Sequence, residues 1–138
     1  MYATPDEAEA AFYAAFAGAN LDAMMEVWLD SDAIACVHPL ALKLAGREAV
    51  RNGWAELFRA GVPVNFRLTD LTRTQDALLS VHTLHEIMRV PPEPGERPPM
   101  TVTNVYQFTD AGWRMLLHHA APVAIQAAPL PPPRRKLH

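Results

Sequence analysis

Apolar residues recur along the first sixty positions with the three-and-four spacing of amphipathic helices. Thr4 and Pro5 supply a start for the first helix, and Gly18 supplies its stop. Gly46 precedes the third helix, and a short apolar stretch that ends in His38 separates it from the second. The pattern predicts helices over residues 4–17, 20–28 and 47–60 and a strand over residues 33–38.

The second half of the chain changes to the alternating pattern of β-strands. The segment "MTVTNVYQF" alternates well and is rich in β-branched and aromatic residues. The proline cluster over residues 91–99 excludes a helix and predicts a hairpin loop, and "TDAG" predicts a turn before the last strand. The expected strands cover residues 64–75, 77–90, 100–108 and 113–125.

Helices followed by hairpin-connected strands indicate an α+β fold. We expect a curved antiparallel sheet that wraps around the three helices and leaves a cone-shaped cavity at its open end. The 138 residues are enough for one domain with a substantial core, which we assign to residues 1–124. Residues 125–138 are Pro-rich and then basic, and we expect them to form a flexible tail.

Composition narrows the range of functions. The formal net charge of −3 provides no basic surface for a nucleic-acid backbone. No segment approaches the roughly 20 apolar residues of a membrane span, and the early acidic residues do not fit a signal peptide. The single cysteine, Cys36, excludes an internal disulfide framework and fits a reducing compartment. We therefore expect a cytoplasmic protein that binds neither nucleic acid nor membranes.

Two motifs carry a family resemblance. The segments "HPLALKLAGREAV" and "WRMLLHHAAP", within a match from about Asp6 to Pro122, resemble the SnoaL-like, ketosteroid-isomerase-like branch of the nuclear-transport-factor-two-like superfamily. The resemblance implies a cone-shaped α+β fold that binds a small, mostly apolar molecule without a cofactor. It also implies a homodimer formed through the outer face of the sheet. Because this fold hosts isomerases, cyclases, hydrolases and non-catalytic binders, the resemblance does not determine an activity.

The resemblance also implies candidate catalytic residues. It places His38 where ketosteroid isomerases carry the aspartate that moves the proton, and Asn104 where they carry the protonated aspartate of the oxyanion hole. Phe12 stands at the position of their helix tyrosine and lacks its hydroxyl group. Because this hydroxyl group is missing, steroid isomerisation itself is not expected. The "HHA" segment of the last strand adds His119 to the candidate catalytic residues.

Strand alternation extends these positions to a set of cavity-facing residues. In the last strand we expect His119 to point inward and His118 outward. In the strand over residues 77–90 we expect His82 and Glu86 to point outward with Leu84, although a shift of one residue would exchange the two faces. The expected inward set is Ile34, Cys36, His38, Val81, Thr83, His85, Ile87, Val102, Asn104, Tyr106, Phe108, Trp113, Met115, Leu117 and His119. The expected ligand-binding residues are Trp54, His85, Tyr106, Phe12 and Leu117.

Two further expectations concern the surroundings of this cavity. Gly53 lies within the third helix, where glycine costs helicity, and it indicates a close approach of another element. No metal site is predicted, because His82 and His85 are three residues apart and point to opposite faces of a strand. A zinc ion held by His38, His85 and His119 is an alternative that we do not favour.

Three interpretations of function remain open. The first, which we favour slightly, is a non-catalytic binding or accessory protein, because loss of one oxyanion donor costs about 10²–10³ in rate. The second is an isomerase-, cyclase- or hydratase-type enzyme in which His38 is the general base and Asn104 the oxyanion donor. In the third, the domain is an association module, and the tail segment "PLPPPRR" binds an aromatic groove of a partner.

Overall fold

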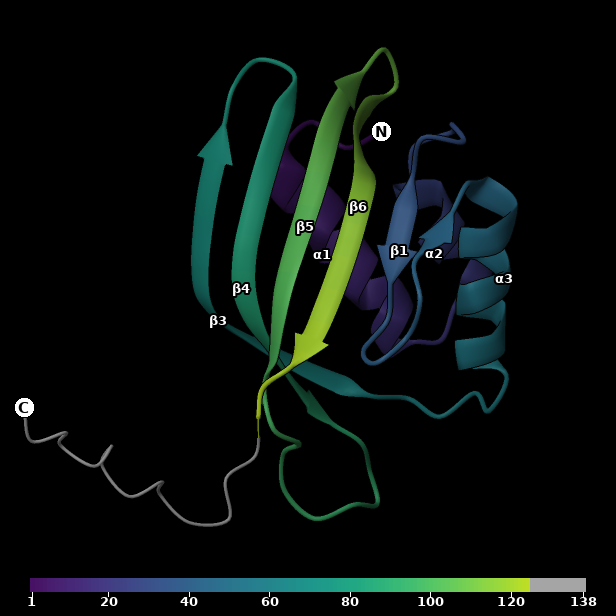
Figure 1. Ribbon diagram of the computed structural model, residues 1–138, viewed down its shortest axis with the longest axis vertical. Coiled ribbons are helices and arrows are strands. Elements are labelled where there is room, and N and C mark those ends of the chain that lie inside the picture. The colour runs from purple at the N-terminus through teal and green to yellow at the C-terminus, as the bar shows by residue number, and fades with distance from the viewer. Residues whose placement is uncertain (125–138) are drawn as a thin grey trace, which may run out of the picture.

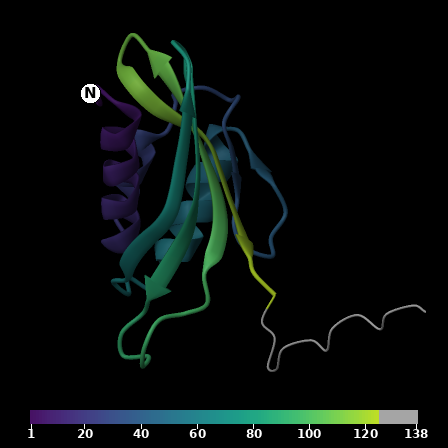
Figure 2. The same ribbon diagram turned by 90° about the vertical axis from the view of Figure 1, so that its left-hand side faces the viewer.

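The structure is a computed structural model that describes residues 1–124. Three helices and six strands form an α+β fold in which the helices pack on one face of a curved sheet (Figures 1 and 2). This confirms the predicted fold class. The tail predicted over residues 125–138 lies outside the described residues.

Local capping signals determine where the helices begin and end. The Thr4 hydroxyl oxygen accepts a hydrogen bond from the Glu7 backbone N–H at 3.1 Å, and Asn20 Oδ1 accepts one from the Ala23 N–H at 3.0 Å. At the other end of the first helix, the Gly18 N–H donates to a carbonyl of the last turn. The helices are α1 (Pro5–Ala17), α2 (Leu21–Val27) and α3 (Arg47–Phe58).

The sheet contains the predicted hairpin-connected strands and one short strand that was not predicted. Its order is β2-β1-β6-β5-β4-β3. All neighbouring strands are antiparallel except β1 and β6, which are parallel, so the sheet is mixed. The unpredicted β2 lies between the strand predicted over residues 33–38 and Gly46. The strands are β1 (Ala35–Val37), β2 (Leu44–Ala45), β3 (Asn65–Gln75), β4 (Leu79–Arg89), β5 (Met100–Thr109) and β6 (Gly112–Pro122).

A β-bulge in β6 reverses the alternation of its side chains. Val105 pairs with Leu117 and the next residue, Tyr106, pairs with Met115, so Leu116 is an extra residue. Before the bulge, Trp113 and Met115 are buried as predicted. After it, His118 is buried and His119 is exposed. The prediction that His119 points inward and His118 outward is therefore wrong, because strict alternation cannot include an inserted residue.

The orientation predicted for β4 is also wrong. Its buried residues are Ser80, His82, Leu84 and Glu86, whereas Val81 and Thr83 lie on the exposed face. The reason is that α1 supplies hydrogen-bond partners for the polar side chains. His82 bonds to Glu9, and Glu86 bonds to Tyr13. The predicted inward set was also the more apolar one, but satisfied hydrogen bonds allow the polar set to be buried.

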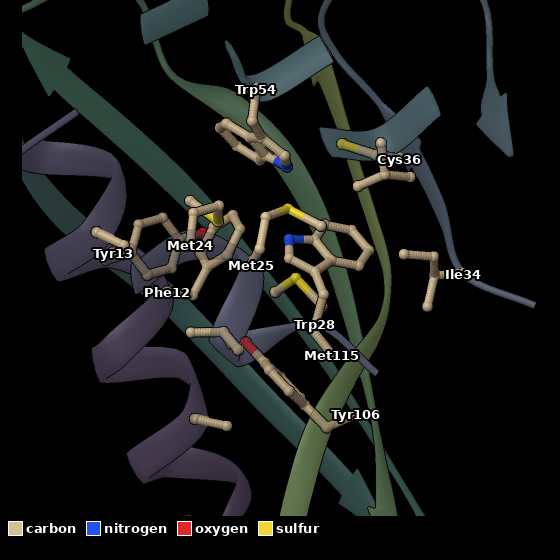
Figure 3. Close-up of a cluster of buried hydrophobic side chains, with 14 of the residues drawn as sticks. Phe12, Tyr13, Met24, Met25, Trp28, Ile34, Cys36, Trp54, Tyr106 and Met115 are labelled. Carbon is tan, nitrogen blue, oxygen red and sulfur yellow. The ribbon is translucent and has the colours of Figure 1, made fainter. Parts of the chain in front are cut away.

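The hydrophobic core fills the space between the helices and the concave face of the sheet. Phe12 and Tyr13 of α1, Trp54 of α3, and Tyr106 and Met115 of the sheet converge there (Figure 3). Phe108, which was expected to belong to this inward set, is 48% exposed near the end of β5. A cavity remains next to this core, at the ends of α1 and α3.

Candidate functional site

The best-formed cavity among the described residues has a volume of about 460 Å³. It lies where the ends of α1 and α3 meet the later parts of β4 and β6 and the loop between β4 and β5. Four polar side chains contribute to its wall, namely His38, Glu86, Arg97 and His118. The rest of the wall is mostly apolar and includes Phe16, Leu57, Phe58, Val64, Met88 and Met100.

His38 directly follows β1, lines the cavity and packs against the Trp54 ring. The two ring centroids are 4.7 Å apart in an edge-to-face arrangement, and His38 Nε2 is 3.7 Å from the Cys36 sulfur. Burial lowers the pKa of His38, because the charged imidazolium form loses hydration there.

Gly53 of α3 makes room for the Leu44 side chain, close to His38. A Cβ atom at position 53 would clash with the Leu44 side chain and would lie 3.6 Å from His38 Nε2. The expectation that Gly53 marks a close approach is confirmed. The glycine lowers the helix propensity of α3, but it allows the β1–β2 segment to pack closely against this helix.

Glu86 is the buried acid of the cavity. Its Oε2 accepts a hydrogen bond from the Tyr13 hydroxyl at 2.9 Å, while the residue as a whole is 3% exposed. Burial raises the pKa of Glu86 from 4.5 to about 7, against the opposing effect of the Tyr13 hydrogen bond. Glu86 is therefore a carboxyl group that ionises close to neutral pH.

His118 faces the same cavity from β6 and bonds to Asn104 of β5. Its Nδ1 lies 2.6 Å from Asn104 Oδ1, and its ring packs against Phe12 with centroids 4.8 Å apart. Burial lowers the pKa of His118 to about 3, and repulsion from His38 and His119 adds to this effect. The His118 ring is thus neutral at physiological pH.

Behind the cavity, Glu9 of α1 organises a second layer of polar side chains. Its Oε2 accepts hydrogen bonds from the Tyr106 hydroxyl at 2.9 Å, the His82 ring at 2.9 Å and the Asn104 amide at 3.3 Å. The same Asn104 amide donates to the Tyr13 hydroxyl at 3.2 Å. Tyr13 therefore connects α1 directly to Glu86. Glu9 and Tyr13 both connect it, through Asn104, to His118.

The predicted site residues fall into three groups. His38 lines the cavity. Asn104 and Tyr106 are buried in the hydrogen-bond network, and Phe12 and Trp54 belong to the core, so none of these four forms part of the cavity wall. The third group, His85, Leu117 and His119, lies neither in the cavity wall nor in the buried network and core. His85 Nδ1 is 3.8 Å from Asp70 Oδ2, and His119 is exposed. The inward orientation predicted for these three is wrong, for the reasons of register given above.

Sequence reasoning missed Glu86, His118, Arg97, Glu9 and Tyr13. Phe12 carries no hydroxyl group, as predicted, but the next residue places one in the interior. The available signals were an acid and a tyrosine four residues apart on the apolar side of α1, and an acid within the otherwise apolar end of β4. These signals did not show that the residues lie close together, because they come from elements that are distant in the sequence.

The alternative zinc site is contradicted by the placement of its ligands. His38 lines the cavity, whereas His85 and His119 lie on the other face of the sheet. Within residues 1–124, no group of three or more histidine, cysteine, aspartate or glutamate side chains is arranged to hold a metal ion. Among the same residues, no helix is long and apolar enough to cross a membrane.

The sequence and the fold together define the class of protein. The chain belongs to the SnoaL-like domain family, whose model matches residues 6–126. Its fold is that of the NTF2-like proteins.

Individual relatives differ widely in how they are named. A candidate calcium/calmodulin-dependent protein kinase type II association domain from Thiobacillus denitrificans is 40% identical, with a TM-score of 0.85 over 90% of this chain and 98% of that one. A candidate dehydratase of the NTF2-like family from Streptomyces avermitilis is 27% identical, with a TM-score of 0.76 over 88% of this chain and 100% of that one. The F-box protein SKIP8 of Arabidopsis thaliana is 28% identical over 106 residues, which are 76% of this chain. The match covers only 43% of the length of that curated relative.

Proposed function

We propose that this protein binds a small, largely apolar molecule that carries a polar group. The observation that supports the proposal best is the cavity of about 460 Å³, whose apolar wall is interrupted by His38, Glu86 and His118. A concave, mostly apolar site with a few convergent polar groups is typical of small-molecule pockets. The volume lies within the roughly 300–1,000 Å³ of pockets that hold drug-sized molecules.

The energetics of Glu86 support a ligand-related role over a purely structural one. A carboxyl group whose pKa is raised by burial destabilises the folded protein wherever it ionises. A glutamine would keep an acceptor for Tyr13 without this cost. Perturbed acids that line a cavity are a feature of functional sites.

A thermal-shift screen with a matched pair of variants tests the proposal. Neutral ketones, lactones, phenols and aromatic acids of suitable size are added to the wild-type protein, and a true ligand at 100 times its dissociation constant raises Tm by roughly 5–10 °C. The variant Leu57→Trp fills the cavity from an exposed position in its wall, whereas Leu78→Trp alters an exposed leucine outside it. The shift should persist in Leu78→Trp and disappear in Leu57→Trp. No shift with any compound, or equal shifts in both variants, would contradict the proposal.

A second candidate function is proton-transfer catalysis of the isomerase, cyclase or hydratase type. The observation that favours it is an acid with a pKa of about 7 beside the neutral His38 and His118 in one cavity, because a general acid or base works best near its own pKa. His38 and Glu86 are the candidate catalytic residues. Asn104 is a poorer oxyanion donor than expected, since its amide already donates to Glu9 and Tyr13.

Chemical change in a bound ligand distinguishes the two functions. For any compound found in the screen, mass spectrometry or deuterium exchange from solvent would reveal turnover by the wild-type protein. Under the catalytic hypothesis, His38→Ala and Glu86→Gln each abolish turnover while the folded fraction stays unchanged. Under the binding hypothesis, the ligand is recovered unaltered and without deuterium.

We further propose that the protein is a cytoplasmic homodimer that associates through the outer face of the sheet. Exposed apolar side chains on that face, Leu79 and Val81 of β4, support the assembly, and the free, buried Cys36 supports the location. Sedimentation equilibrium should give twice the chain mass for the wild type. Val81→Lys should give the monomer mass, and Leu40→Lys, at an exposed leucine away from this face, should remain dimeric.

A further inference from the structure

We infer that the polar group of the ligand is a hydroxyl group, of an alcohol or a phenol, which donates its hydrogen to Nε2 of His118. This inference rests on the proposed binding function and specifies the chemical class of the ligand. It follows from the positions that protons must occupy in the network behind the cavity.

The orientation of the Asn104 amide is the first step. Its nitrogen lies 3.3 Å from Glu9 Oε2 and 3.2 Å from the Tyr13 hydroxyl. Glu9 Oε2 already accepts hydrogen bonds from Tyr106 and His82. Turning the amide over would place its oxygen against this acceptor, so the NH₂ group must face Glu9.

The tautomer of His118 is the second step. Because the Asn104 NH₂ group faces Glu9, its Oδ1 faces His118 Nδ1 at 2.6 Å, and an oxygen acceptor requires a donor there. The proton of the His118 ring therefore lies on Nδ1. The lowered pKa of His118 keeps the ring neutral, so Nε2 carries a lone pair and no proton.

The cavity offers this lone pair to a ligand. His118 lines the cavity, and among residues 1–124 its only hydrogen bond is the one through Nδ1. A ligand atom that meets Nε2 must supply a hydrogen, which a hydroxyl or an N–H group does and an ether oxygen or a carbonyl does not. We favour a hydroxyl group because its oxygen, unlike an amide nitrogen, can also accept a hydrogen bond from a protonated carboxyl group.

Glu86 is a second polar group in the wall of the same cavity. Below pH 7 it carries its own proton, since its pKa is about 7, and it can donate a hydrogen bond to a ligand oxygen. An anionic ligand is less well suited. The Arg97 guanidinium, the cationic group of the cavity wall, is already bound by Glu93 through contacts of 3.0 and 2.8 Å.

A matched pair of probes tests the inference. 2-Naphthol and 2-methoxynaphthalene have the same ring system and are both neutral at pH 6, but only the first can donate a hydrogen bond. Isothermal titration at pH 6 should show 2-naphthol binding to the wild-type protein roughly 10-fold more tightly. In His118→Phe, which keeps an aromatic ring against Phe12, the difference should fall to less than about twofold. His119→Phe, the adjacent exposed histidine, should retain the full preference.

A measurement on the wild-type protein avoids any dependence on the folding of the variants. Long-range ¹⁵N–¹H correlation spectra of the histidine rings show which nitrogen of His118 is protonated. The inference requires a proton on Nδ1 and none on Nε2 at pH 6 to 8. A proton on Nε2 would overturn it.

The outcomes separate this inference from the binding function itself. Equal affinity for the two probes, or tighter binding of the ether, overturns the hydroxyl inference and leaves the binding function standing. Failure of both probes to bind, together with an unsuccessful screen, overturns both.

Discussion

Replacing Glu86 by glutamine should stabilise the protein at alkaline pH and have a much smaller effect at acidic pH. The folded protein holds the pKa of Glu86 at about 7, compared with 4.5 for an ordinary glutamate. Because the folded-state pKa is the higher one, the stability associated with neutral Glu86 is fully present below pH 4.5 and is lost as the pH rises through 7.

The size of the effect follows from this difference in pKa. Linkage predicts that ionisation of Glu86 costs about 1 kcal/mol at pH 5 and about 3 kcal/mol at pH 8. Glutamine has nearly the same shape and can still accept the Tyr13 hydrogen bond, so its main effect is to remove this cost. Its stabilising effect should therefore be about 2–2.5 kcal/mol greater at pH 8 than at pH 5.

Urea unfolding at pH 5 and pH 8 measures the difference directly. For a domain of this size, the expected gain at pH 8 corresponds to an increase of roughly 1–2.5 M in the midpoint. Glu26→Gln, at an exposed glutamate, is the control and should shift the midpoint equally at both pH values. An effect of Glu86→Gln that does not depend on pH would refute the assignment of Glu86 as a buried acid that titrates near neutrality.

Three further variants test the supporting structure. Tyr13→Phe should cost about 1–3 kcal/mol in urea unfolding and raise the pKa of Glu86, measured by ¹³C NMR titration, because a hydrogen bond that lowers this pKa is lost. Gly53→Ala should change stability by less than about 1 kcal/mol, because the better helix propensity of alanine is offset by the movement that the new Cβ requires of the Leu44 terminal methyl group. Glu9→Ala should cost more than about 3 kcal/mol in the same assay, because three buried donors lose their shared acceptor.

Each of these variants has a control in the same element. Ala14→Ser alters an exposed position of α1 and should change stability by less than about 0.5 kcal/mol. Asn52→Ala, beside Gly53 but exposed, should be neutral or slightly stabilising. A loss of more than about 2 kcal/mol for Gly53→Ala would show that the Leu44 side chain cannot move aside. A cost below 1 kcal/mol for Glu9→Ala would show that its network is satisfied by water.

Local sequence signals were sufficient for most of the secondary structure. Thr4, Asn20 and the two glycines Gly18 and Gly46 act on backbone groups within a few residues, so their effect can be seen in the sequence alone. The alternation of β5 is similarly local, and its prediction that Val102, Asn104 and Tyr106 face inward is confirmed. The family resemblance added the curvature of the sheet and the cone.

The site depended on contacts between elements that are distant in the chain. Strict alternation failed in β6 because a bulge inserts Leu116, and it failed in β4 because a helix more than sixty residues away supplies partners for His82 and Glu86. The sequence by itself determined the three helices and the hairpin-connected strands, and the family resemblance added a cavity with His38 at its edge. Only the tertiary structure decided that Glu86 and His118 are the other polar groups of that cavity. The physical reason is that a polar side chain can face a protein interior only where another element satisfies it, and that partner cannot be identified from the strand itself.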